Sequence, residues 1–218
     1  MHRINFHAWG LVIALFFVAP AIGAEDPDAP VPKPAVKVGD RWTYRAIDHF
    51  TNQTVSEIGT EVTFVGADAI FVVERPKGGD SELDSRWTSE WAVVASATGE
   101  VYKTPANLLK FPLKVGGKHE AIFETSAVRV SSGRWKAEMT ATVVGWEDVT
   151  VPAGKFRALK IEAQGSFQGL DIRYAGLVRQ DYWYVPEVKR WVKWHVESRV
   201  NNSLSRKETR ELVDFKVQ

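Results

Sequence analysis

The sequence predicts an all-β fold of about nine or ten antiparallel strands with little helix. Three observations carry this prediction. Apolar and polar residues alternate with a period of two along most of the chain after Val38, as in strands that bury one face. β-branched and aromatic residues are frequent in these runs, and Gly, Pro, Asn and Asp separate them. No later stretch keeps a helical period for about a dozen residues.

The first 24 residues read as a secretory signal peptide and not as part of this fold. Arg3 precedes an apolar run over Ala8–Val18, and small residues then lead to Ala24. The run is shorter than the roughly 20 apolar residues that a membrane-spanning helix needs. We therefore expect cleavage near Ala24, with Ala21 as the alternative, and no retained membrane anchor. The expected location is periplasmic or secreted, in a bacterium.

Residues 25–37 form a proline-rich leader between this segment and the domain. The stretch holds four prolines and no aromatic residue, a composition that favours extended conformations and suits a spacer. No second linker of this kind follows. Residues 38–218 are therefore expected to form a single antiparallel β domain.

The strands are expected in runs bounded by turn residues. Val151-Pro152-Ala153-Gly154 has the chemistry of a tight turn and joins two of the longest runs. Residues 77–84 read as a polar loop, and Thr104–Phe111 is the best candidate for a single helical turn. The clearest runs cover residues 42–50, 56–66, 69–76, 134–144, 155–165, 192–200 and 211–217. Because some runs exceed about ten residues, we expect bends or bulges that curve the sheet.

Alternation also predicts the orientation of the tryptophans near the C-terminal side. Trp194 shares the parity of Val192 and Val196, so it is expected to face the core. Trp191 shares the parity of the polar neighbours Lys193 and His195, so it is expected on the opposite, exposed face.

Composition excludes several classes of function. The formal charge is only +1, with 28 basic and 27 acidic residues and no basic stripe, so nucleic acid is not an expected partner. The chain has no Cys, which removes disulfides, thiolate catalysis and cysteine-held metals. Nine Trp are present. Stability must then come from an aromatic-rich core.

No catalytic or metal-binding constellation is apparent. Outside the predicted signal peptide the histidines are His49, His119 and His195. They lie far apart and lack the spacing of metal ligands. The densest acidic cluster, Asp80–Asp84, lacks the order of a calcium loop. Glu147 and Asp148 are expected to face solvent. We therefore predict no catalytic residue, no metal and no cofactor, and a protein that is not an enzyme.

Four segments resemble a family of bacterial secreted and periplasmic proteins of unknown function. Its pattern has the form FPLxxG, VxVPAGxF and WYxPxV followed by a final strand. The matching segments are Phe111–Gly116, Val149–Phe156, Tyr182–Trp194 and Glu211–Val217. The resemblance implies one curved antiparallel sheet wrapped as an open or half barrel, similar in shape to lipoprotein-localisation factors. The chain departs from the pattern after Pro186, where Glu187 and Lys189-Arg190 replace the family's glycine.

Together these observations favour an exported, non-enzymatic cell-envelope domain. We expect it to bind a hydrophobic small molecule or lipid on the concave face of the sheet, because exposed aromatic side chains form recognition surfaces. The candidate lining residues are Trp135, Met139, Trp183 and Trp194, with plain core packing as the alternative. Two other functions remain open. One is a structural or assembly factor that binds an envelope protein, and the other, less favoured, is a cell-wall or sugar hydrolase.

Overall fold

The computed structural model is a barrel of twelve strands. It describes residues 29–127, 133–171 and 173–218. The predicted signal peptide and its cleavage site lie outside these residues. The strands are β1 (Arg41–Asp48), β2 (Gln53–Val65), β3 (Ile70–Pro76), β4 (Leu83–Trp87), β5 (Val93–Ala95), β6 (Val101–Ala106), β7 (Lys118–Ala127), β8 (Trp135–Val151), β9 (Gly154–Gly169), β10 (Ala175–Val185), β11 (Arg190–Val200) and β12 (Ser203–Lys216). A 3₁₀ turn, η1 (Pro186–Val188), precedes β11.

Each strand pairs antiparallel with its neighbour in sequence, and β1 pairs with β12 to close the sheet. The prediction of an all-β antiparallel fold with little helix is confirmed. The prediction of an open or half barrel is wrong, because the sheet closes on itself. Closure occurs where Trp42 and Tyr44 of β1 lie opposite Phe215 and Leu212 of β12. Periodicity within each strand carries no information about pairing between strands so far apart in sequence.

The predicted strand number is also too low, because short strands lie between residues 83 and 106. β4, β5 and β6 span only three to six residues each. Such segments are too short to show a clear alternation. Thr104–Ala106, expected to begin a helical turn, belongs to β6. Residues 107–113 have no helical structure.

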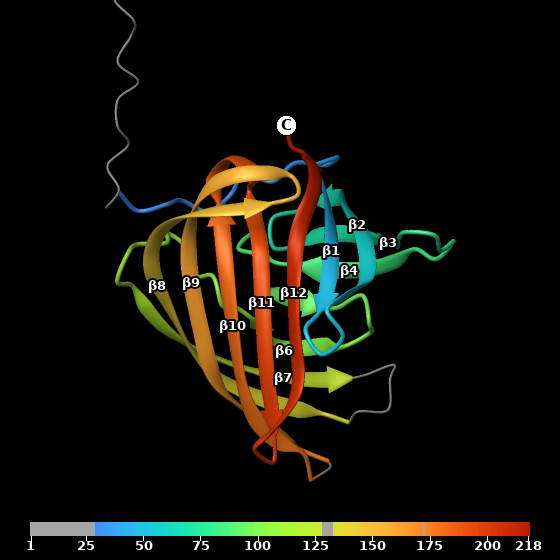
Figure 1. Ribbon diagram of the computed structural model, residues 1–218, viewed down its shortest axis with the longest axis vertical. Coiled ribbons are helices and arrows are strands. Elements are labelled where there is room, and N and C mark those ends of the chain that lie inside the picture. Colours follow the sequence, from blue (N-terminus) through green and yellow to red (C-terminus); the bar gives the residue numbers. More distant parts are fainter. Residues whose placement is uncertain (1–28, 128–132, 172) are drawn as a thin grey trace, which may run out of the picture.

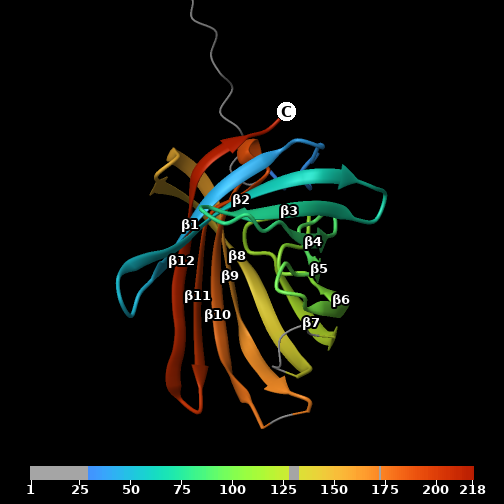
Figure 2. The ribbon, with the colours of Figure 1, turned by 90° about the vertical axis from the view of Figure 1, so that its right-hand side faces the viewer.

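The long strands β8–β12 form a tall wall, and the shorter strands β3–β6 lie across from it (Figures 1 and 2). The turn predicted at residues 151–154 joins β8 to β9, and Val151 lies directly opposite Gly154. Gly154 has φ 140°, a conformation that glycine adopts readily. A bulge between Val143 and Gly145 bends β8, so the expected curvature has an identified source.

One end of the barrel is closed by the chain that precedes β1 and by η1. Val31 is 7% exposed and forms an isolated bridge with Leu113. The second half of the expected leader therefore packs against the domain. Asp40 is fully buried, accepts hydrogen bonds from the backbone N–H groups of Lys37 and Gln218, and forms an ion pair with Lys189. These contacts tie the segment before β1, the turn after η1 and the end of the chain together.

Candidate functional site

The barrel encloses a cavity of about 360 Å³. Ten of the strands contribute to its wall, so it belongs to the interior and not to a single face of the sheet. The lining residues are Tyr44, Ala46, Ser56, Ile58, Thr60, Glu74, Trp87, Trp91, Val93, Glu100, Tyr102, Ala106, Leu108, Leu109, Trp135, Gln180, Tyr182, Arg190, Trp191, Trp194, Arg206 and Arg210. Its size lies within the range of small-molecule pockets in proteins, roughly 300–1,000 Å³.

The closed end of this cavity is a cluster of rings, which we call the aromatic cage. Trp42 and Trp91 meet edge to face with ring centroids 5.4 Å apart, and Trp91 lies 6.2 Å from Trp191. Contacts of this geometry stabilise aromatic cores beyond simple burial. The cage consists of Trp42 and Tyr44 from β1, Trp87 and Trp91 from β4 and the following loop, and Trp191 from β11.

Polar atoms of the cage hold the backbone around the start of β11. The Trp42 indole N–H donates to the carbonyl of Val188 at 2.9 Å, and the Trp91 indole N–H donates to Lys189 at 2.8 Å. The Tyr44 hydroxyl donates to the carbonyl of Trp191 at 2.6 Å. The residue between these carbonyls, Arg190, is therefore fixed from both sides.

Arg190 extends into the aromatic cage. Its guanidinium carbon lies 4.6 Å from the ring centroids of Trp91 and Trp191, and 5.2–5.6 Å from the other three rings. Such cation–π contacts stabilise a buried cation. The side chain is 4% exposed, and burial lowers the pKa of the guanidinium from its ordinary value. Arginine still carries its charge at neutral pH because that value is so high.

The guanidinium has no carboxylate partner among the described residues, since no ion pair within 4.0 Å includes it. Its Nε and Nη1 atoms are buried without a hydrogen bond. Glu74 attracts the charge from a greater distance, and its own carboxylate accepts a hydrogen bond from the Ser85 hydroxyl at 3.1 Å. A buried, unpaired cation of this kind is rare, which marks this end of the cavity.

The other end of the cavity is polar and more exposed. The guanidinium groups of Arg206 and Arg210 lie 5.4 and 5.1 Å from the Trp194 ring, and both form ion pairs with Glu208. The Gln180 side-chain oxygen accepts hydrogen bonds from the Trp194 indole N–H at 3.0 Å and from the Tyr182 hydroxyl at 2.6 Å. Arg206 is exposed, so this end faces solvent. The cavity is thus aromatic and cationic at its closed end and polar at its mouth.

The four predicted lining residues have different positions. Trp135 and Trp194 line the cavity. Met139 is 3% exposed and lies in the core, on the same face of β8 as Trp135 but outside the cavity lining. Trp183 lies on the outer face of the barrel, where its indole N–H donates to the Glu147 carboxylate. A ligand role for any of them stays a prediction.

The expected exposure of Trp191 is wrong. Trp191 is 8% exposed and lies in the aromatic cage. In the pairing of β10 with β11, Trp183 lies opposite Lys193 whereas Tyr184 lies opposite Trp191. The extra residue, Val192, forms a bulge, and a bulge shifts the parity of every residue before it. Strict alternation therefore assigns Trp191 to the wrong face.

The sequence pattern does not identify Arg190 as a site residue. Lys189-Arg190 differs from the family pattern only in replacing its glycine. Lys189 adopts φ 60°, a conformation in which glycine is common, and its ammonium pairs with Asp40. The one sequence feature that points to Arg190 as a site residue is its position directly before an aromatic residue at the start of a strand.

The expectation that the three histidines lie far apart is wrong for one pair, because the ring centroids of His195 and His49 are 5.7 Å apart. His119 lies apart from them, and its ring bonds the carbonyl of Asn107. Asp148 pairs with Arg157 on the surface. Within the described ranges, no group of three or more His, Asp or Glu side chains has the geometry to hold a metal ion. The same ranges contain no helix with the length and apolar character needed to cross a membrane.

Comparison with known proteins supports the fold. No protein-family model matches the chain, and no curated protein matches it significantly. The chain is similar to the crystal structure of a "putative lipoprotein" from Parabacteroides distasonis ATCC 8503, with 13% identity and a TM-score of 0.54 over 86% of this chain and all of that one. A second structure, a "putative exported protein with YmcC-like fold" from Bacteroides fragilis NCTC 9343, aligns over the same shares at 14% identity and a TM-score of 0.49. At this identity the first likeness shows a shared fold.

Proposed function

We propose that this protein is exported to the cell envelope and binds a hydrophobic small molecule or lipid inside its barrel, without catalysing a reaction. The observation that carries the proposal is the interior cavity of about 360 Å³ with its aromatic lining. Pockets that combine aromatic walls with polar groups are typical of ligand-binding sites. The site lies inside the barrel instead of on the concave face of an open sheet.

Two observations support the location. The N-terminal segment has the order of a secretory signal peptide. The similar structure from Parabacteroides distasonis is described as a putative lipoprotein, a class of envelope protein. Cell fractionation with the tagged chain tests this part, and recovery in the cytoplasm with an uncleaved N-terminus would contradict it.

Native mass spectrometry of protein purified from periplasm without detergent tests the binding. We expect a bound species that adds mass to the polypeptide and exchanges with added fatty acid. A bare polypeptide mass, with no uptake of fatty acid on incubation, would contradict the proposal.

A pair of variants on β2 locates the ligand. Ser56 lines the cavity, so Ser56→Phe places a large ring in the space and should abolish the added mass. Val55 is 56% exposed and does not line the cavity, so Val55→Phe is the matched control. Equal loss in both variants would argue against binding in the interior.

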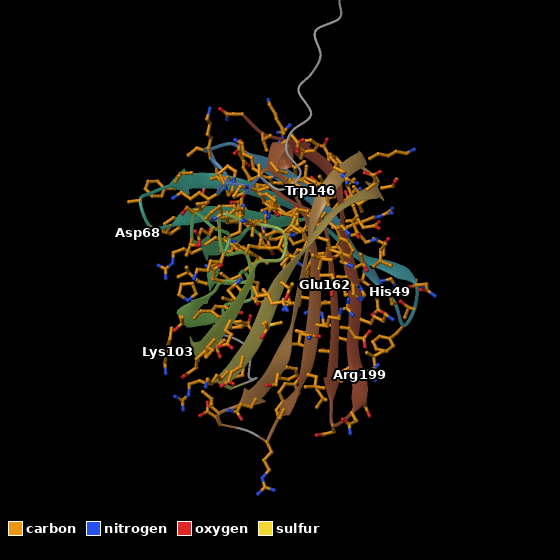
Figure 3. The ribbon with its side chains drawn as sticks, turned by 90° about the vertical axis from the view of Figure 1, so that its left-hand side faces the viewer. His49, Asp68, Lys103, Trp146, Glu162 and Arg199 are labelled. Atoms are coloured by element: carbon orange, nitrogen blue, oxygen red, sulfur yellow. The ribbon has the colours of Figure 1, made fainter. Side chains whose placement is uncertain are left out.

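A second candidate function, binding of an envelope protein partner, is favoured by one feature of the outer surface. A concavity on the outer face of β7–β11 is lined by the exposed apolar side chains of Ile122 and Leu177, with charged residues around them. Figure 3 shows Arg199 of this region and Glu162 above it on the same wall. Co-purification of a stoichiometric protein from intact envelopes, lost in Leu177→Glu, would support this candidate over the first.

A further inference from the structure

The closed end of the cavity carries a positive charge without an ion-pair partner among the described residues. We propose that Arg190 binds the carboxylate of a single-chain amphiphile, whose hydrocarbon chain occupies the rest of the cavity. This inference rests on the proposed function, because it names the head group of the molecule bound in the barrel.

The first argument is the state of the guanidinium. Arg190 is 4% exposed and lines the cavity, and two of its nitrogen atoms have no acceptor. The five rings of the aromatic cage stabilise the charge but accept no N–H···O hydrogen bond from it. A buried cation strongly favours an anionic partner. A ligand carboxylate supplies that charge, and a planar carboxylate also matches the geometry of a guanidinium.

The second argument is the charge of the cavity as a whole. Three arginines and two glutamates line it, so the lining is positive overall. Arg190 lies at the closed end, and Arg206 and Arg210 lie at the mouth. A positive mouth attracts anions toward the cavity. The closed end then provides the place where the charge of the ligand is neutralised.

The third argument is size. A volume of about 360 Å³ corresponds to roughly twelve water molecules at about 30 Å³ each. A saturated carboxylate of medium length, such as decanoate, has a similar volume. With its head group at Arg190, the chain of such a molecule would run past Tyr102 and Leu108 toward Trp135.

Three probes with the same chain test the head group on the wild-type protein. Binding of decanoate, decanol and decyl phosphate is followed by tryptophan fluorescence at pH 7.5. We expect decanoate to bind about tenfold more tightly than decanol, because a hydrogen bond to a charged group strengthens binding. Equal affinities for decanoate and decanol would overturn the head-group inference while leaving the proposed function intact. Tight binding of decyl phosphate alone would overturn the carboxylate assignment. Binding of none of the three probes would count against the proposed function itself.

Substitutions then assign the effect to one side chain. Arg190→Met removes the charge and keeps an unbranched side chain among the rings, so the preference for decanoate should vanish while decanol affinity stays within about twofold. Arg157→Met removes a charge on the outer surface, outside the cavity lining, and should leave the preference in place. A preference that survives in Arg190→Met would contradict the assignment.

Arg190→Lys keeps the variant series decisive even if Arg190→Met does not fold. Near-ultraviolet circular dichroism reports the packing of the aromatic cage in each variant. The lysine retains a charge but not the planar geometry, so we expect a reduced preference for decanoate over decanol. An unchanged preference in this variant would contradict a guanidinium–carboxylate contact.

Discussion

At the scale of single residues, His195 on the outer face responds to pH. His195 and His49 both form hydrogen bonds with the Thr209 hydroxyl, at 2.9 and 2.7 Å, and His49 lies at the β1–β2 turn (Figure 3). Burial lowers the pKa of His195, and the charges of His49 and Lys207 lower it further. The carboxylates of Asp181 and Glu197 oppose this shift.

The lowered pKa of His195 predicts loss of stability in acid. The unfolded chain, with a histidine pKa near 6.5, binds the proton more readily than the folded chain. The contribution of His195 to the free energy of unfolding is therefore present above about pH 6.5 and lost as the pH falls below it. Urea denaturation between pH 7.5 and 5.0 should show a steeper loss for the wild type than for His195→Gln. Identical pH profiles would contradict this account.

Asp40 is a second single residue on which the stability of the fold depends. Its carboxylate is fully buried and pairs with Lys189 at 3.0 Å. Asp40→Ala leaves a largely buried ammonium without its partner and should lower the free energy of unfolding by about 3 kcal/mol. Asp148, which pairs with Arg157 on the surface, is the control, and Asp148→Ala should cost about 1 kcal/mol or less. Equal costs in the two variants, measured by urea denaturation, would show that burial is not decisive.

At the scale of elements, β8 and β9 approach each other closely at Gly165. A Cβ atom at Gly165 would lie 2.0 Å from the carbonyl oxygen of Glu138 and 2.7 Å from the Cα atom of Met139. Both are backbone atoms, so the strands would have to move apart. Gly165→Ala should therefore destabilise the protein by about 2 kcal/mol or more, measured by thermal unfolding.

A glycine in β2 provides the matched control. A Cβ atom at Gly59 would meet nothing closer than the carbonyl oxygen of Arg75 at 3.8 Å. Gly59→Ala should leave stability unchanged or raise it by up to about 1 kcal/mol, since alanine restricts the unfolded chain. A melting temperature that falls equally in both variants would contradict the steric explanation.

The elements also show which parts of the fold were predictable. Long strands such as β8 and β9 follow from alternation, and their turn follows from Pro152 and Gly154. The position of Trp191 does not, because the bulge at Val192 arises from pairing between two strands. The same limit applies to Trp183, which lies on the outer face although it belongs to the predicted aromatic group. Arg190 could not be predicted as a site residue, because its surroundings come from β1, from β4 and the segment after it, and from β11 itself.

At the scale of the whole molecule, the length of pairing between neighbouring strands differs around the barrel. β8 pairs with β9 along nearly its full length, from Trp135 opposite Gly169 to Val151 opposite Gly154. β5 pairs with β4 and β6 through only a few residues on each side. Short pairings with exposed hydrogen bonds open more easily than long ones.

Hydrogen exchange should report this difference directly. We expect the amides of β5 and β6 to exchange much faster than those in the central parts of β8 and β9. Mass spectrometry of the exchanged protein, with peptides that cover these strands, is the measurement. Uniform protection around the barrel would mean that the sheet opens only as a unit.

Closure of the sheet could not be predicted from the alternation in the sequence. Each hairpin is a local feature, whereas the pairing of β1 with β12 joins residues such as Arg45 and Glu211 across nearly the whole domain. Whether the sheet closes depends on strand number and on accumulated twist, neither of which periodicity measures.

The pairing of β1 with β12 also sets the order in which the protein can be completed. During synthesis, β1 emerges long before β12 exists to cover its free edge. Until then the growing sheet has two unpaired edges, which are sites of aggregation. The barrel interior, and with it any ligand site, comes into being only when the final strand docks.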